Sequence, residues 1–223
     1  MADRGRPRSF DRNVALVRAT RLFWERGYEA TSLADLTAAM GINSPSLYAA
    51  FSSKEALYSE VVELYVDAEA KSNRAVLEAA STAKEAIEGL LRRAAGRIAR
   101  KGEPTGCLIM LGAINCAPEN SHISEHLTAQ RQLAERAIRE RIERGVADGD
   151  VGSLADINAL SSFYVSILKG LSVSARDGMK QADLEKVVTC AMAAWDASCR
   201  GRDEGGSNRR GVARLRRGHR SSP

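Results

Sequence analysis

Helical periodicity extends through most of this chain of 223 residues and constrains its fold more than any other feature. From Asp11 to about Arg200, alanine, leucine, glutamate and arginine recur at helical spacing. No segment sustains the alternation of apolar and polar residues that is typical of a strand. Glycine, proline and asparagine divide this span into segments of helical length. The sequence therefore predicts an all-α fold of about nine helices.

The expected helices follow from apolar stripes and from residues that end helices. In residues 11–26, Ala15, Ala19, Leu22 and Phe23 share one face, and Gly27 is suited to end the helix. Residues 107–117 are apolar nearly all round, so we expect this segment to be a buried central helix. The other expected helices cover residues 33–40, 44–51, 54–80, 83–100, 124–147, 153–176 and 181–199.

Two of the short helices are separated by a tight turn. Ser32 with Asp35 three residues later has the pattern of a capping box, and Gly41-Ile42-Asn43 provides residues that tolerate a left-handed backbone. Ser44 and Pro45 supply a cap and a first-turn proline for the next helix. With helix 11–26 packed behind them, these helices predict a helix-turn-helix DNA-binding domain over residues 11–53.

The second short helix carries side chains that suit contact with DNA. Small hydroxyl and methyl groups near its start allow close approach to base edges, whereas a phenol and an ammonium donate to phosphates at the groove walls. A hydroxyl beside the start of the preceding helix offers a further phosphate contact. For Tyr48, core packing with an exposed hydroxyl is the alternative. The predicted contacts are Thr31, Ser32, Asn43, Ser44, Pro45, Ser46, Tyr48, Ala49 and Lys54.

Positive charge is concentrated at the two ends of the chain. Residues 1–12 hold four arginines against two aspartates, and residues 200–223 hold eight arginines against Asp203 and Glu204. Since the whole chain carries +5, residues 13–199 carry −3. We expect a flexible basic arm over residues 1–10 and a disordered arginine-rich tail over residues 201–223. Either end is suited to bind a polyanion, and the alternative for the tail is solubility alone.

Arg6 lies in the segment Arg4-Gly5-Arg6-Pro7-Arg8, which resembles the core of an AT-hook. Glycine and proline keep such a segment thin and extended, so that arginines can enter a narrow A·T minor groove. Nonspecific contact with phosphates is the alternative. We therefore predict that Arg6 contacts DNA.

A larger set of residues keeps a fixed order and spacing between Leu22 and Leu57. The set comprises Leu22-Phe23, Gly27-Tyr28, Thr31-Ser32, Leu36, Gly41-Ile42, Leu47-Tyr48, Phe51 and Lys54-Glu55-Ala56-Leu57. It resembles the DNA-binding signature of tetracycline-repressor-family regulators. The resemblance implies a homodimer that binds a palindromic double-stranded operator as a repressor and is released by a small-molecule effector. Ala49 and Met40 depart from the family pattern, so we expect direct readout to be sparse.

The same resemblance implies an effector-binding and dimerisation domain over residues 54–200. The apolar stripes of helices 153–176 and 181–199 predict that these helices pack across a twofold axis as a four-helix bundle. The helix from residue 54 to residue 80 is expected to link the two domains rigidly. On expected burial and position, the residues predicted to line the pocket for the unknown effector are Tyr65, Met110, Ile114, Phe163, Tyr164 and Trp195.

Other functions receive little support from the sequence. Neither a Gly-rich phosphate loop after a strand nor Gly-x-Ser-x-Gly is present, so we expect no enzyme and no cofactor. His122 and His126 are four residues apart but lack a metal-binding signature, and no metal site is expected. Cys107 and Cys116 on one short helix leave a redox sensor as an alternative, and the arginine tail leaves an architectural DNA-binding protein. Without a signal peptide or spanning segment, we expect a cytoplasmic protein that does not bind membranes.

Overall fold

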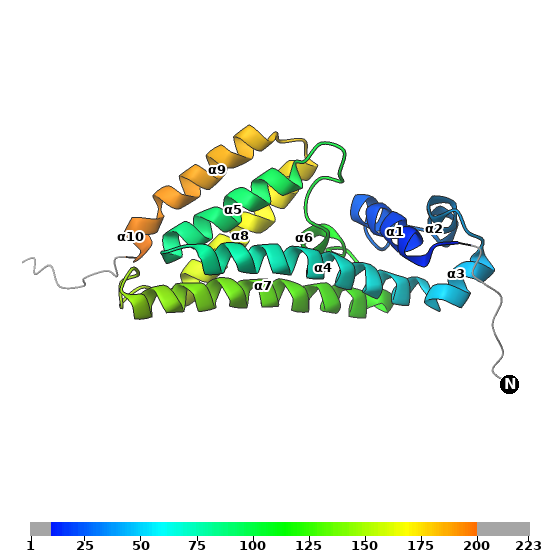
Figure 1. Ribbon diagram of the computed structural model, residues 1–223, viewed down its shortest axis with the longest axis horizontal. Coiled ribbons are helices and arrows are strands. Elements are labelled where there is room, and N and C mark those ends of the chain that lie inside the picture. Colours follow the sequence, from blue (N-terminus) through cyan, green and yellow to red (C-terminus); the bar gives the residue numbers. More distant parts are fainter. Residues whose placement is uncertain (1–9, 200–223) are drawn as a thin grey trace, which may run out of the picture.

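The computed structural model describes residues 10–199, and this part of the chain is helical without strands, which confirms the all-α prediction (Figure 1). The described part contains ten α-helices and one 3-10 helix, η1, against the nine expected. The elements are α1 (Arg12–Arg26), α2 (Leu33–Met40), α3 (Ser44–Phe51), α4 (Lys54–Ala79), α5 (Ala83–Ile98), α6 (Leu108–Leu111), η1 (Pro118–Asn120), α7 (Ser121–Asp148), α8 (Ile157–Arg176), α9 (Gln181–Ala193) and α10 (Trp195–Cys199).

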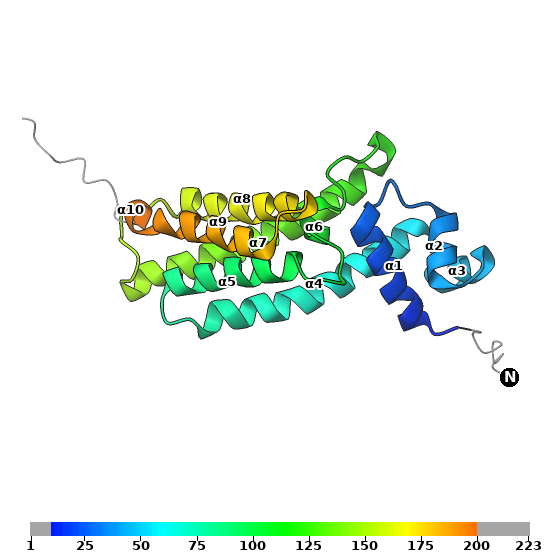
Figure 2. The ribbon, with the colours of Figure 1, turned by 90° about the horizontal axis from the view of Figure 1, so that it is seen from above.

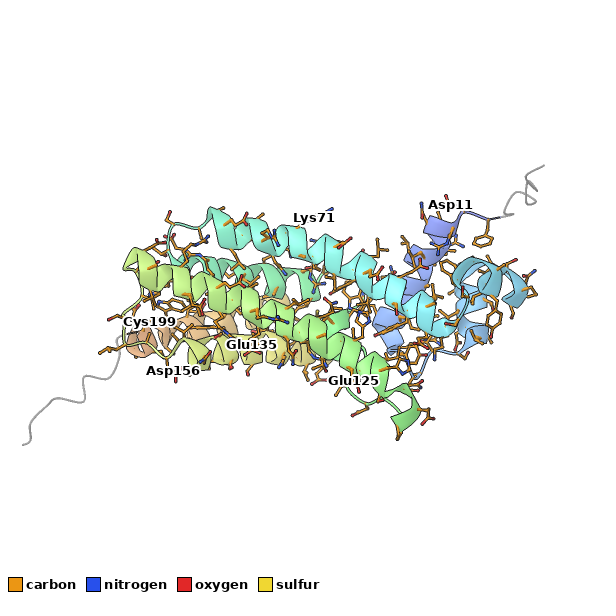
Figure 3. The ribbon with its side chains drawn as sticks, turned by 90° about the horizontal axis from the view of Figure 1, so that it is seen from below. Asp11, Lys71, Glu125, Glu135, Asp156 and Cys199 are labelled. Carbon is orange, nitrogen blue, oxygen red and sulfur yellow. The ribbon has the colours of Figure 1, made fainter. Side chains whose placement is uncertain are left out.

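Helices α1 to α3 form a head at one end of an elongated molecule (Figures 1 and 2). Helices α4 and α7 both begin near this head and run toward the far end, where α10 lies. Asp11 and Cys199 accordingly lie at opposite ends in Figure 3. No described helix is long and apolar enough to cross a membrane.

The apolar segment 107–117 is the main departure from the expected helices. Only Leu108–Leu111 is helical, so the prediction of one buried helix there is wrong. The reason lies in bonds to the head: the Gly112 carbonyl accepts the Tyr28 N–H at 3.1 Å, and the Ala117 N–H donates to the Glu29 carboxylate at 2.8 Å. These contacts replace the hydrogen bonds that would continue the helix.

Three other expected helices differ from the structure by more than two residues at one end. Helix α7 begins at Ser121 rather than residue 124, directly after η1. Helix α8 begins at Ile157 rather than residue 153, because the Asp156 carboxylate accepts the Ala159 N–H and caps the helix there. The last expected helix is interrupted at Ala194, after which α10 begins with the buried Trp195.

Two apolar cores stabilise the described part of the chain. One joins α1, α2 and α3 to the first half of α4, to α6 and to the start of α7, with Phe23, Leu47 and Tyr58 at its centre. The other joins α5, α8, α9 and α10 to the second halves of α4 and α7. The domain boundary predicted after residue 53 falls at the N-cap of α4, but the core of the head continues along α4 as far as Tyr65.

Candidate DNA-binding site

The turn between α2 and α3 has the geometry of a helix-turn-helix. Gly41 takes a left-handed conformation with φ 70° and ψ 34°, which glycine adopts without steric cost. The Asn43 side chain then accepts the Ser46 N–H at 2.9 Å, so Asn43 is the N-cap of α3. The prediction that Ser44 supplies this cap is wrong, because Ser44 is already the first helical residue.

Helix α3 buries one face and presents the other to solvent. Leu47 and Phe51 pack into the core of the head. The Tyr48 side chain is 47% exposed, which contradicts the alternative that it packs in the core. Around it, Ser46 is half-buried and the following predicted contacts are exposed: Asn43, Ser44, Pro45 and Ala49. The structure therefore brings the predicted base-contacting residues together on one outward face.

Two arginines of α1 fix this face against the rest of the head, and the sequence analysis missed both. The Arg12 guanidinium donates to the Ala50 carbonyl at 3.2 and 3.3 Å and pairs with Glu60 of α4 at 2.6 Å. The exposed Arg18 donates to the Met40 carbonyl at 3.4 Å, beside the α2–α3 turn. Both arginines thus contact backbone carbonyls at helix ends, where the macrodipole favours a cation. Arg12 is half-buried and lies over the Phe51 ring, and nothing in the local sequence indicated the contacts of either arginine.

The start of α2 differs from what the sequence predicted. Thr31 is fully buried and its hydroxyl donates to the Gly27 carbonyl at 2.7 Å, so the expectation that it presents a hydroxyl to phosphate is wrong in this conformation. Ser32 is exposed, but it forms the capping box with Asp35. Hydrogen bonds from Ser32 lower the pKa of the Asp35 carboxyl, and Arg26 lowers it further. An ionised carboxylate therefore already occupies the N-terminus of α2.

Lys54 is the first residue of α4 and stacks on an aromatic ring of the head. Its ammonium lies 4.1 Å from the centroid of the Tyr28 ring, a cation–π contact. Partial burial lowers the pKa of Lys54, and the nearby Glu29 opposes that shift. The contact holds the Lys54 ammonium against the Tyr28 ring, at the start of the helix that follows α3. Its contact with phosphate stays a prediction, and Arg6 lies outside the described residues.

A cavity of about 800 Å³ lies in the second half of the molecule, lined by residues of α4, α5, α6, α7 and α8. Of the residues predicted to line an effector pocket, Tyr65 and Met110 lie in its wall. Tyr164 and Trp195 pack against each other in the second core, with ring centroids 5.5 Å apart, and do not line the cavity.

Ile114 and Phe163 do not line it either, and their predicted burial is wrong. Ile114 is 57% exposed because its segment is not helical, and Phe163 is 41% exposed because it faces outward from α8.

Backbone contacts join the wall of this cavity to α1. The segment from Thr105 to Gly112 carries Cys107, Ile109 and Met110 in the cavity wall. Its Gly106 carbonyl accepts the indole N–H of Trp24 at 3.0 Å, and Gly112 accepts the N–H of Tyr28 as described above. Hydrogen bonds therefore join the segment from Thr105 to Gly112 to the end of α1 and to the residue Tyr28 that follows it.

The C-terminal end of α8 contacts both the end of α1 and the segment from Thr105 to Gly112, here called the cavity segment. The Arg176 guanidinium donates to the carbonyls of Trp24, Glu25 and Thr105 at 3.0 to 3.1 Å. Arginine at the end of a helix suits carbonyls that have no partner within the helix. One side chain thus holds the end of α1, the cavity segment and α8 together.

The remaining predicted features lie apart from one another. His122 pairs with Glu55 at 3.1 Å, and no group of three potential metal ligands occurs in residues 10–199. Cys107 and Cys116 do not share a helix, so the observation that motivated a redox sensor is wrong. All four cysteines are free, and Cys107 lies 3.5 Å from the Tyr65 hydroxyl.

A helix-turn-helix head joined by a long helix to a helical domain with a cavity defines the class of helix-turn-helix transcriptional regulators. Residues 15–61 match the family described as bacterial regulatory proteins, tetR family. The chain is 36% identical over 189 residues to the HTH-type transcriptional repressor ComR of Escherichia coli, a match that covers 84% of this chain and 89% of ComR. It is 31% identical over 191 residues to the repressor BdcR of the same organism, covering 85% and 90%.

A solved structure supports the same assignment. A cysteine mutant of the TetR family transcriptional regulator CifR, complexed with 26-base-pair double-strand operator DNA, aligns with a TM-score of 0.83. The two chains are 44% identical, and the alignment covers 86% of this chain and 100% of that one. The chain belongs to the tetR family of bacterial regulatory proteins. It is therefore a DNA-binding transcriptional regulator and not an enzyme, as the sequence predicted.

Proposed function

We propose that this regulator is a cytoplasmic repressor, which binds a palindromic operator as a homodimer and is released when a small molecule enters the cavity. The observation that carries the proposal is the shared segment Thr105–Gly112, which lines the cavity and bonds to α1. A ligand between α4, α5 and α7 acts on this segment, and the segment acts on the head. ComR and BdcR are named repressors, which favours repression over activation.

The DNA-binding half of the proposal rests on α3 and its neighbours. In this proposal, the exposed face of α3 enters the major groove. Ser44 and Ser46 then lie at base edges, and Tyr48 lies at a phosphate. Lys54 and Arg18 flank that face and supply cations for the two strands of the groove. In CifR, a family member of the same fold, the partner is double-strand operator DNA.

Exposed apolar side chains on α8 and α9 support the homodimer. Phe163 and Val173 of α8 and Val187 of α9 are each between 37% and 45% exposed. Gly170 lies on the same side of α8 as Phe163 and Val173, and a Cβ added there would meet no described atom within 4 Å. A small residue between apolar ones permits close packing of two helices. A second copy of α8 and α9 is the partner that would complete a four-helix bundle.

Footprinting with the full-length protein tests the proposal. The expected result is one discrete footprint with twofold symmetry upstream of a regulated gene. Uniform protection of the DNA would instead indicate an architectural protein and overturn the proposal. A Ser46→Ala and Tyr48→Phe double variant should need a higher protein concentration to give the discrete footprint, whereas substitution of the exposed Lys71, far from the head on α4, should give it at the parent's concentration (Figure 3).

A further inference from the structure

The cavity carries an excess of positive charge although the body of the protein is acidic. Residues 13–199 have a net charge of −3, yet the cavity wall contains six arginines and three glutamates. The arginines are Arg74, Arg93, Arg97, Arg136, Arg141 and Arg144, and the glutamates are Glu69, Glu78 and Glu140. Lining charges of one sign in a partly closed cavity raise the local concentration of the opposite charge.

Two of these arginines, Arg97 and Arg93, have one carboxylate between them. Arg97 and Arg93 share a single carboxylate oxygen of Glu69, at 3.0 and 3.3 Å. The side chain of Arg97 is only 13% exposed, and its second terminal nitrogen, Nη1, is buried with no hydrogen-bond partner in the described part of the chain. A buried N–H group of a guanidinium is costly when it lacks an acceptor. In addition, one carboxylate neutralises only one of two cations.

Arg141 repeats this feature further along the cavity. The residue is 4% exposed and donates to the carbonyls of Leu77 and Ala80 at the end of α4, but its Nη1 is buried without a partner among residues 10–199. Burial lowers the pKa of Arg141, and the neighbouring Arg144 lowers it further. Glu69 and Leu77, the α4 residues that Arg97 and Arg141 contact, are eight residues apart, which is roughly 12 Å along the helix.

Apolar residues also contribute to the wall of the cavity. Leu90, Ile98, Ile109, Met110 and Leu168 contribute side chains to it. A cavity of about 800 Å³ lies within the range that accommodates drug-sized ligands, whose surface is mostly apolar with few polar anchors. The wall therefore suits a molecule with an apolar body and an anionic group.

We infer that the effector of this regulator is an amphipathic organic carboxylate, whose anionic group is bound by Arg97 and Arg93. This inference rests on the proposed function. The carboxylate accepts from Arg97 Nη1 and supplies the second negative charge that Glu69 alone does not provide. Its apolar body lies along the aliphatic side chains toward Arg141.

Arg97 also connects the cavity to the head. Its guanidinium carbon lies 5.6 Å from the Trp24 ring centroid and 5.3 Å from that of Tyr65. Trp24 belongs to α1, and its ring packs edge-on against Tyr65 at 5.1 Å. A carboxylate that draws the guanidinium toward the cavity weakens these stacking contacts. The same residue thus detects the anion and changes the packing of α1.

Calorimetric titration of the full-length dimer with two matched pairs tests the inference: decanoate against decan-1-ol, and 1-naphthoate against 1-naphthylmethanol. At least one acid should bind about tenfold or more tightly than its alcohol, as expected for hydrogen bonds to a charged donor. Arg97→Gln should weaken acid binding by about tenfold or more and leave alcohol binding unchanged. Arg97→Lys keeps the charge but loses the planar group of donors of the guanidinium. Its affinity for the acid should therefore lie between those of the parent and of Arg97→Gln.

Arg92→Gln is the matched control, because Arg92 is an exposed arginine of the same helix that pairs with Glu88 and does not line the cavity. It should bind like the parent. Failure of both acids to bind, equal affinity for acid and alcohol in both pairs, or equal effects of the Arg97 and Arg92 substitutions would overturn the inference. An acid that binds through Arg97 without lowering operator affinity would leave the anion site intact and refute effector release instead.

Discussion

Lys54→Ala offers the most quantitative test of the DNA-binding surface. If each Lys54 ammonium contacts one phosphate, a dimer loses two such contacts, and the slope of log K against log salt falls by about 1.8. Between 200 and 50 mM salt, a fourfold change, that slope corresponds to a factor of about 12 in affinity. The variant should therefore bind operator and random DNA alike more weakly, and its deficit should be about twelvefold larger at the lower salt concentration.

The structure adds a second expected effect of the same substitution. The Lys54 ammonium stacks on the Tyr28 ring, so its removal also costs about 0.5–1 kcal/mol of folding stability. Urea unfolding measures this loss separately from DNA binding. Lys54→Arg keeps both the charge and the stacking, so it should retain the parent's salt slope.

Fluorescence anisotropy at four salt concentrations, with operator and random duplexes, provides the slopes. Lys71→Ala is the matched control, since Lys71 lies on the same helix away from the head and is exposed (Figure 3). A Lys54→Ala slope equal to that of the parent and of Lys71→Ala, in protein shown to be folded, would refute the phosphate contact.

Other substitutions test the base contact, the packing of the head and the dimer interface one at a time. Ser46→Ala should cost on the order of 1 kcal/mol on the operator with little change on random DNA, because a base contact is lost but no charge; equal losses on both would contradict this. Tyr58→Phe should leave urea stability unchanged or raise it by up to about 1 kcal/mol, because the buried Tyr58 hydroxyl has no hydrogen-bond partner in the described chain; a clear loss would show a hidden partner. Phe163→Arg, which places a charge on the exposed face of α8, should shift sedimentation from dimer to monomer at micromolar concentration, and an unchanged dimer would exclude that face from the interface.

The head was predictable because its signals are local. The capping box at Ser32, the left-handed Gly41 and the apolar spacing through Leu47 and Phe51 each act within a few residues, and together they define the turn. The error at Thr31 has the same origin. Two adjacent hydroxyl residues at the start of α2 suit a phosphate contact equally well in sequence, and only the packed core decides that Thr31 is the buried one.

The cavity was not predictable because its charges act between helices. Arg93 and Arg97 are four residues apart, and this spacing is typical of the solvated face of a helix. Their partner Glu69 lies on another helix, and nothing in the local sequence brings it near. The expected pocket was instead composed of large apolar residues, and two of them, Tyr164 and Trp195, stabilise the second core.

The contacts around α1 determine how a ligand would move the head. The end of α1 is tied to the cavity segment by the Trp24 indole N–H, which donates to the Gly106 carbonyl, and by the Arg176 guanidinium, which donates to the carbonyls of Thr105, Glu25 and Trp24. Arg97 contacts this junction by stacking on the Trp24 ring and makes none of these hydrogen bonds, so in the proposed mechanism its displacement changes the packing of Trp24 and leaves the hydrogen bonds in place. In the proposed mechanism, helix α1 therefore moves with the cavity segment. Arg12 bonds the opposite end of α1 to α3 and α4, so in the proposed mechanism the movement is carried to the face proposed to contact DNA. The ligand would then shift the DNA-bound population only by its differential affinity for the two arrangements.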